Sequence, residues 1–150
     1  MNIDPTEHRR DRYVMSMSIP TRWNDYDMLG HVNNVLYNRY VEITVLELVK
    51  RAGVNWMTDR VVPFAAEVCV MFLRPLNFSE HIDSMLRVGR LGTSSVVYEV
   101  ALYMPDDESP SAVAHFVHVF VDRDTERPVP MPAAVRDVFE RHMALAEPAR

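Results

Sequence analysis

The chain has 150 residues, of which 48% are hydrophobic and 25% charged, so it fits one globular domain with its own core and is not broadly disordered. Its formal net charge of -5 argues against general nucleic-acid binding, which requires a basic face. The single cysteine, Cys69, excludes a disulfide within the chain, and no apolar run is long enough to span a membrane. We therefore expect a cytoplasmic protein that does not enter a membrane.

The chain reads as one domain over residues 13–145, because no linker or repeat divides it. Residues 1–12 are polar and lack periodicity, which predicts a loose leader. Residues 146–150 predict a loose tail for the same reason.

The first periodic segment is Tyr13–Pro20, in which apolar and polar residues alternate as in a half-buried strand. A polar loop follows, and then a long helix pattern begins near Asn33 or Asn34, both of which are good N-cap residues. Gly53 follows this pattern at a position that tolerates a left-handed backbone. The helix is apolar around most of its girth, so we expect other structure to cover most of it.

Four further strand patterns follow, over residues 64–75, 82–91, 94–104 and 112–121. The first of them is apolar on both faces, as expected of a central or an interface strand. A short amphipathic helix begins after Pro132, which suits its first turn. The order of elements predicts an α+β fold in which an antiparallel sheet of about five strands curls around one long buried helix, with a C-terminal helix added.

The loop before the long helix concentrates the residues that could carry chemistry. The segment from Arg22 to Asn34, RWNDYDMLGHVNN, holds two acids, a glycine, a histidine and two asparagines. A helix N-terminus leaves backbone N–H groups without partners and carries partial positive charge, so it can hold a developing oxyanion. An acid beside it can attack a carbonyl or activate water. On spacing alone, Asp27 could equally well bind loop amides, whereas Asp25 is more typical of a residue that structures the loop.

The segment RWNDYDMLGHVNNVLYNRYVE resembles the 4-hydroxybenzoyl-CoA thioesterase-like branch of the hotdog superfamily. It is also similar to plant acyl-ACP thioesterases, which share the run Asp…His-Val-Asn-Asn…Tyr, and the segment FLRPL at residues 72–76 is similar to the family's arginine–proline segment. The resemblance implies a hotdog fold and a catalytic carboxylate at Asp27. It also implies a homodimer or homotetramer with active sites between subunits. The plant enzymes add a catalytic histidine that falls on His31, but they have asparagine where this chain has Leu29, and many bacterial members have an apolar residue at the position of His31.

Other residues near Asp27 have a functional and a structural interpretation. His31 could polarise the substrate carbonyl through its backbone N–H, orient water or cap the loop. Gly30 could let the carbonyl approach the backbone closely, or could be an ordinary turn glycine. Of Asn33 and Asn34, one can cap the helix while the other points into the site. Tyr37, one turn into the helix, could border the acyl pocket or belong to the core.

The coenzyme A part of a substrate needs partners for its phosphates and amides. Arg74, Arg87 and Arg90 are candidates for the phosphates, because the planar guanidinium can bind phosphate oxygens with two hydrogen bonds. Ser94 and Ser95 could bind the pantetheine amides. All five side chains could instead be ordinary polar groups at strand ends.

Other classes of site find little support. The chain lacks the Gly-x-Ser-x-Gly elbow of α/β-hydrolases, and His115 and His118 would face opposite sides of one strand, so we expect no metal site. We predict an acyl-CoA thioesterase that needs no cofactor, coenzyme A being part of the substrate. The alternatives are an acyl-ACP thioesterase and a non-catalytic acyl-CoA-binding protein. A hotdog hydratase fits less well, because its Asp/His pair has one more intervening residue.

Overall fold

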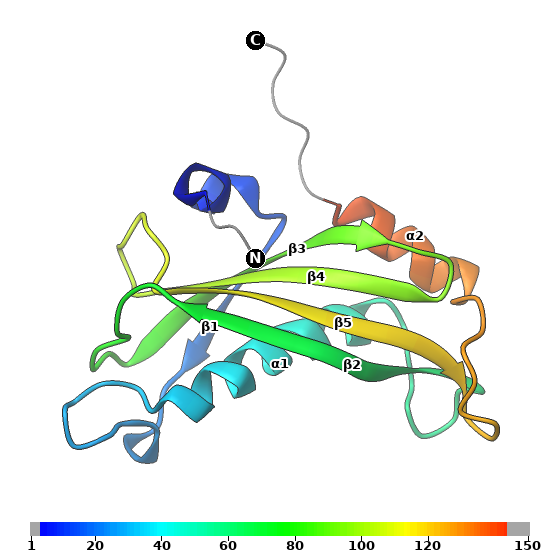
Figure 1. The fold of residues 1–150 in the computed structure, drawn as a ribbon, viewed down its shortest axis with the longest axis horizontal. Coiled ribbons are helices and arrows are strands. Elements are labelled where there is room, and N and C mark those ends of the chain that lie inside the picture. Colours follow the sequence, from blue (N-terminus) through cyan, green and yellow to red (C-terminus); the bar gives the residue numbers. More distant parts are fainter. Residues whose placement is uncertain (1–3, 144–150) are drawn as a thin grey trace, which may run out of the picture.

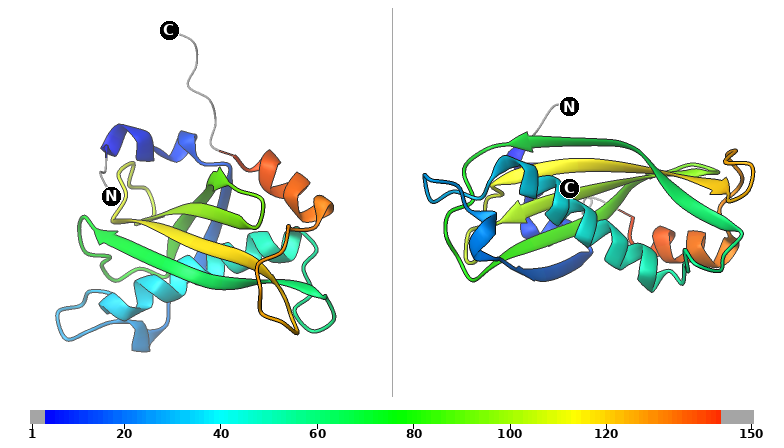
Figure 2. Two further views of the ribbon diagram at one scale, coloured as in Figure 1. Left: turned by 45° about the vertical axis from the view of Figure 1, so that its right-hand side comes forward. Right: turned by 90° about the horizontal axis from the view of Figure 1, so that it is seen from below.

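In the computed structural model, which describes residues 4–143, five antiparallel strands form one sheet in the order β1-β3-β4-β5-β2. The strands are β1 (Met15–Pro20), β2 (Val61–Phe72), β3 (His81–Leu91), β4 (Ser95–Tyr103) and β5 (Ala112–Asp122). The long helix α1 (Asn34–Arg51) crosses one face of this sheet, which curls around it (Figures 1 and 2). The predicted α+β architecture is confirmed.

Helix α1 begins and ends where the sequence pattern predicts. The side chain of Asn33 accepts a hydrogen bond from the Val35 amide, which makes Asn33 the N-cap. Gly53 follows the helix with a φ of 92°, a backbone conformation that glycine adopts without strain. The buried face repeats every three to four residues and packs against the sheet; it comprises Tyr37, Tyr40, Val41, Thr44, Val45, Leu48 and Val49. The opposite face stays open, since Val35 is 67% exposed, so the helix is less enclosed than expected.

The C-terminal helix α2 (Ala133–Arg141) lies on the same face of the sheet as α1. Its Phe139 is fully buried, with its ring edge-on to that of Tyr98 on β4 and also against Phe120 on β5. Pro132 is the N-cap of α2, one position before the first turn in which it was predicted. These rings extend the main core beyond the end of α1.

Residues 4–12 differ from the predicted loose leader. They contain two 3-10 turns, η1 (Pro5–His8) and η2 (Arg10–Arg12), which lie against the face of the sheet opposite α1. Arg10 attaches them, because its guanidinium forms a 2.8 Å ion pair with Asp83 and lies 4.5 Å from the ring centroid of Tyr103. The predicted tail, residues 146–150, lies outside the described residues.

Strand β2 is an edge strand, hydrogen-bonded to β5 alone among the strands of residues 4–143. Several of its apolar side chains are open: Phe64 is 43%, Val68 45% and Phe72 53% exposed. Of the two roles that its sequence allowed, central strand or interface strand, the structure excludes the first. Within the described range, no helix is long and apolar enough to cross a membrane.

Candidate active site

The loop between β1 and α1 is anchored by Asp25, a residue that is 1% exposed. One carboxylate oxygen accepts hydrogen bonds from the Arg22 amide (2.9 Å) and the Tyr40 hydroxyl (2.8 Å). The other accepts from the Arg22 guanidinium at 3.1 and 3.2 Å. The backbone carbonyl of Asp25 accepts from the Asn33 amide, which ties the loop to the start of α1. The prediction that Asp25 structures the loop is confirmed.

These contacts also determine the charge of Asp25. Desolvation alone would raise the pKa of its carboxyl, but hydrogen bonds from the Arg22 amide and the Tyr40 hydroxyl favour the charged form, as does the Arg22 guanidinium. Together they outweigh burial and lower the pKa of Asp25 below its usual value. Asp25 is therefore a bound, ionised anchor with no free oxygen to offer a substrate.

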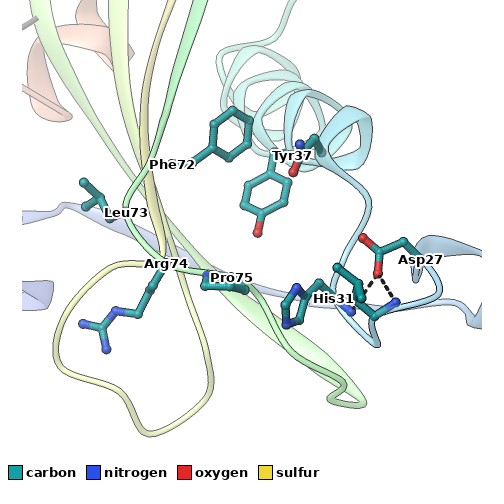
Figure 3. Close-up of a pocket in the computed structure, with 9 residues that line it drawn as sticks. Asp27, His31, Tyr37, Phe72, Leu73, Arg74 and Pro75 are labelled. Atoms are coloured by element: carbon teal, nitrogen blue, oxygen red, sulfur yellow. Dashed lines mark hydrogen bonds between the residues drawn. The ribbon is translucent and has the colours of Figure 1, made fainter.

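Asp27 closes a tight turn but keeps one carboxylate oxygen open. Its Oδ1 accepts hydrogen bonds from the amides of Leu29 (2.8 Å) and His31 (3.2 Å), and its own amide donates to the His31 carbonyl at 2.8 Å. Figure 3 shows both bonds to the carboxylate. In residues 4–143, Oδ2 has no hydrogen-bond partner, and the side chain is exposed. Asp27 thus binds loop amides with one oxygen and presents the other to the cavity.

Nearly every amide at the start of α1 is already bonded. The amides of Gly30, Val32 and Asn33 donate to backbone carbonyls, and those of Leu29 and His31 donate to Asp27. The Val35 amide donates to the Asn33 side chain, and the Leu36 amide to the Asn33 carbonyl. Within the described part of the chain, the Asn34 amide has no acceptor. Of the amides in the predicted oxyanion site, residues 30–34, only that of Asn34 is therefore available to an oxyanion. It lies at the helix N-terminus, which carries partial positive charge.

A cavity of about 390 Å³ lies between this loop, the first turn of α1 and the end of β2 (Figure 3). It is lined by Asp27, Leu29, His31, Asn34, Tyr37, Phe72, Leu73, Arg74 and Pro75. The structure thus brings together five of the predicted site residues: Asp27, His31, Asn34, Tyr37 and Arg74. Leu29, Phe72, Leu73 and Pro75 were not predicted as site residues. The FLRPL segment was the available signal for the last three.

Tyr37 forms the wall beside Asn34. Its hydroxyl accepts a 2.9 Å hydrogen bond from the Leu76 amide, and its ring lies edge-on to Phe72 with centroids 4.9 Å apart. Burial raises the pKa of Tyr37, the Leu76 amide opposes this by favouring the phenolate, and the charge of Asp27 adds to the rise. The phenol therefore stays protonated, with its proton available to an acceptor in the cavity.

Two predicted residues beside the cavity have structural contacts instead. Gly30 does not line the cavity; it has a φ of 75° in the Asp27 turn, which fits the turn-glycine interpretation. Asn33 caps the helix with its side-chain oxygen and does not line the cavity, so its contact with substrate stays a prediction. Its neighbour Asn34 is the one that borders the cavity, as expected for one member of the pair.

The predicted phosphate partners are mostly elsewhere. Arg74 borders the cavity, but Figure 3 shows its guanidinium extending away from Asp27, where it lies 3.8 Å from Asp107. Arg87 is 8% exposed, pairs with Glu99 at 2.5 Å, donates to the backbone carbonyl of Glu7 and covers the Tyr13 ring. Its guanidinium is bound on the face of the sheet opposite α1, away from the cavity, so the structure offers no support for the predicted phosphate contact of Arg87.

Arg90, Ser94 and Ser95 lie at the opposite end of the sheet from the cavity, where β3 turns into β4. The cavity lies at the Phe72 end of β2. This end pairs with the start of β5, which in turn pairs with the end of β4. Along β4 this separation is about 20 Å or more, at roughly 3.3 Å per residue. Within one chain, these side chains are therefore too far away to line the Asp27 cavity.

The described residues contain no group of three histidine, cysteine or acidic side chains that could hold a metal ion. His115 contacts Glu67 at 2.6 Å, whereas His118 is buried beside Tyr98, and the two lie on opposite faces of β5. The polar residues that line the cavity are Asp27, His31, Asn34, Tyr37 and Arg74.

The curled antiparallel sheet around one helix, with an acidic loop at the helix N-terminus, defines a hotdog-fold protein of the thioesterase type. The chain belongs to the thioesterase-like superfamily, whose family profile matches residues 21–139. No match was found among curated proteins.

Solved structures agree with this assignment. The PA5185 protein from Pseudomonas aeruginosa PAO1 is 36% identical, with a TM-score of 0.87 over 93% of this chain and 98% of that chain. The PA2801 protein of the same species is 31% identical, with a TM-score of 0.76 over 81% of this chain and 95% of that one. A 1,4-dihydroxy-2-naphthoyl-CoA thioesterase from Synechocystis shares the fold at 10% identity, with a TM-score of 0.74 over 83% of this chain and 93% of that one.

Proposed function

We propose that this protein hydrolyses acyl-CoA thioesters to the free acid and coenzyme A, with Asp27 as the catalytic carboxylate. One observation carries the proposal: Asp27 and Asn34 line the same cavity, and in residues 4–143 neither Oδ2 of Asp27 nor the backbone amide of Asn34 has a hydrogen-bond partner. A thioester whose carbonyl oxygen meets the Asn34 amide would present its carbonyl carbon to the Asp27 side of that cavity. Membership of the thioesterase-like superfamily supports the same reaction.

In one route Asp27 is a general base. Oδ2 takes a proton from water while the water oxygen attacks the carbonyl carbon, and the Asn34 amide stabilises the negative charge that develops on the carbonyl oxygen. The tetrahedral intermediate then collapses, the C–S bond breaks, and the proton passes from Asp27 to the departing thiolate. The free acid and coenzyme A leave.

In the other route Asp27 is a nucleophile. Oδ2 attacks the carbonyl carbon, the C–S bond breaks, and a mixed anhydride with Asp27 forms as the thiolate leaves. Water then hydrolyses the anhydride, releasing the acid and restoring the carboxylate. In both routes the two amides on Oδ1 hold the carboxylate plane fixed, so that Oδ2 keeps its orientation.

We further propose that the site is completed by a second copy of the chain, in a homodimer or a dimer of dimers. Asp27 is exposed, and the apolar side chains around the cavity are open, with Leu29 78% and Leu73 45% exposed. Edge strand β2 adjoins this cavity and offers unpaired backbone groups beside further apolar side chains. Pairing of two β2 strands would cover these surfaces and exclude water from the reacting atoms.

Thiol release from a panel of acyl-CoA esters tests the proposal. Asp27→Asn should lower kcat at least 100-fold while leaving the circular dichroism spectrum and the unfolding midpoint close to those of the parent protein. Asp137→Asn, which changes an exposed acid on α2, serves as the control and should retain activity. Full activity of Asp27→Asn on a good substrate would overturn the assignment. Tight acyl-CoA binding without thiol release by the parent protein would instead indicate a binding protein.

The same assay, run with matched acyl groups on coenzyme A and on acyl carrier protein, tests the carrier. We expect the coenzyme A esters to be the better substrates, with a higher kcat/KM. A preference for the carrier-protein esters would keep the chemistry but assign the protein to the acyl-ACP thioesterases.

A further inference from the structure

A second cavity, of about 290 Å³, lies between edge strand β1 and the N-terminal half of α1. Figure 2 shows β1 in blue beside the start of α1 in cyan. The cavity is separate from the Asp27 cavity, since the two share no lining residue. The proposed reaction gives it no role.

The walls of this second cavity are mainly apolar. Met17 and Ile19 line it from β1, and the ring of Tyr40 and the side chain of Ile43 line it from α1. Ile19 and Tyr40 belong to the buried core, whereas Met17 and Ile43 are partly exposed and form the open side. A ligand here would bury an apolar body against four hydrophobic side chains.

The charged groups at this cavity leave one cation without a partner. Asp25 and Arg22 line it as an ion pair, and all four bonds accepted by the Asp25 carboxylate come from Arg22 and Tyr40. Arg39 also lines it, and in residues 4–143 its guanidinium has no carboxylate or carbonyl partner. The net charge at the rim is therefore positive, and the bound Asp25 carboxylate has no free lone pair to compete for a ligand's donor.

We propose that this cavity binds a small carboxylic acid, with the carboxylate on Arg39 and the apolar chain between β1 and α1. A guanidinium suits this ligand, because its planar donors match the two oxygens of a carboxylate. The volume is at the lower end of the range for ligand sites, which favours a short chain. The acid released by thioester hydrolysis has this chemistry, so the cavity would hold product outside the active site; that link, unlike the binding itself, rests on the proposed function.

Octanoate binding to the Asp27→Asn protein, followed by methyl NMR, tests the proposal without any turnover. We expect saturable shifts of the Ile19 and Ile43 methyl signals, whereas the methyls of Val121, buried on β5 and remote from β1, should stay in place. Octanamide, which lacks the charge, and acetate, which lacks the chain, should each bind at least tenfold more weakly.

Two variants examine the cation and the cavity separately. Arg39→Gln should weaken octanoate binding roughly tenfold, the change expected for one charge-assisted hydrogen bond, and Lys50→Gln further along α1 should not weaken it. Ile43→Trp should fill the cavity and abolish the methyl shift of Ile19. Equal binding by Arg39→Gln and the parent protein, or shifts confined to the Leu29 and Leu73 methyls of the other cavity, would overturn the proposal. Neither result would bear on catalysis by Asp27.

Discussion

The Tyr40 hydroxyl donates a 2.8 Å hydrogen bond to Oδ2 of Asp25 and so connects the second turn of α1 to the loop that carries Asp27. Both residues are buried, at 1% exposed each. The position of the candidate catalytic carboxylate thus depends on a buried acid two residues earlier, which the helix itself holds in place. This relationship links the stability of the fold to the geometry of the site.

Tyr40→Phe tests this link, because it removes the hydroxyl and preserves the ring. The Asp25 carboxylate would lose one of its donors in a buried environment, which should lower the free energy of unfolding at pH 7 by about 1.5–3 kcal/mol. Urea unfolding measures this loss. Tyr26→Phe is the control, because its hydroxyl bonds only neutral groups of Thr21 and Ser79.

The pH dependence of Tyr40→Phe follows from the pKa of Asp25, which is lower in the folded protein than its usual value. A lowered folded-state pKa contributes stability that is fully present above the unfolded pKa and is lost as pH falls through the folded value. Loss of the Tyr40 donor raises the folded pKa, so acid unfolding of Tyr40→Phe should begin at a higher pH than that of the parent protein. Acid unfolding of Tyr26→Phe should begin at the same pH as that of the parent protein. If acid unfolding of Tyr40→Phe began at the same pH as that of the parent protein, Tyr40 would not stabilise the charged form of Asp25.

The burial of His118 predicts a second pH dependence of stability, at higher pH than that of Asp25. Burial lowers the pKa of His118 from 6.5 to about 4, because the charged ring cannot be solvated beside Tyr98. The unfolded chain takes up a proton below about pH 6.5 while the folded protein does not, so stability falls between pH 6.5 and about 4, by on the order of 3 kcal/mol. His118→Gln should remove this part of the pH dependence. Parallel pH profiles for both proteins, from urea unfolding at several pH values, would contradict it.

Val68→Lys tests the proposed assembly. Val68 is 45% exposed near the middle of edge strand β2, where a lysine would place a charge in the proposed interface between two strands. We expect sedimentation or light scattering to show a shift from dimer toward monomer, together with at least a tenfold loss of thiol release. Met57→Lys, at a position that is 86% exposed and outside β2, is the matched control and should leave the assembly unchanged. A monomeric parent protein would end the interface proposal.

The sequence predicted the order and type of the elements because the periodicity that specifies them is local. The position of a strand within the sheet depends on contacts that are remote in the sequence. The pattern of β2, apolar on both faces, is compatible with a central strand and with an edge strand. Arg87 shows the same limit, since its partner Glu99 lies directly opposite only once the register of β3 and β4 is known. In the site, Asp27 and its loop were recognisable. The FLRPL segment drew attention to Phe72 and Leu73, but only the tertiary structure places these two residues in the wall of the Asp27 cavity.

Asn34→Pro gives the sharpest test of the oxyanion site. Proline lacks the N–H group and is well accommodated at the first helical position, which Asn34 occupies. The preceding residue, Asn33, has a φ of -60° and a ψ of 136°, a conformation that a following proline allows. Asn34→Pro should therefore keep the unfolding free energy within about 1 kcal/mol of the parent.

Its kcat should nevertheless fall about 100- to 1000-fold, the usual loss for one oxyanion donor. Asn34→Ala is the matched control, because it removes the side chain that borders the cavity and keeps the amide; it should retain activity within a few-fold of the parent. Equal losses in both variants would assign the effect to the Asn34 side chain. Full activity of Asn34→Pro would show that the carbonyl oxygen is stabilised by another group, and the Tyr37 phenol, beside Asn34 with its proton free, would be the next candidate.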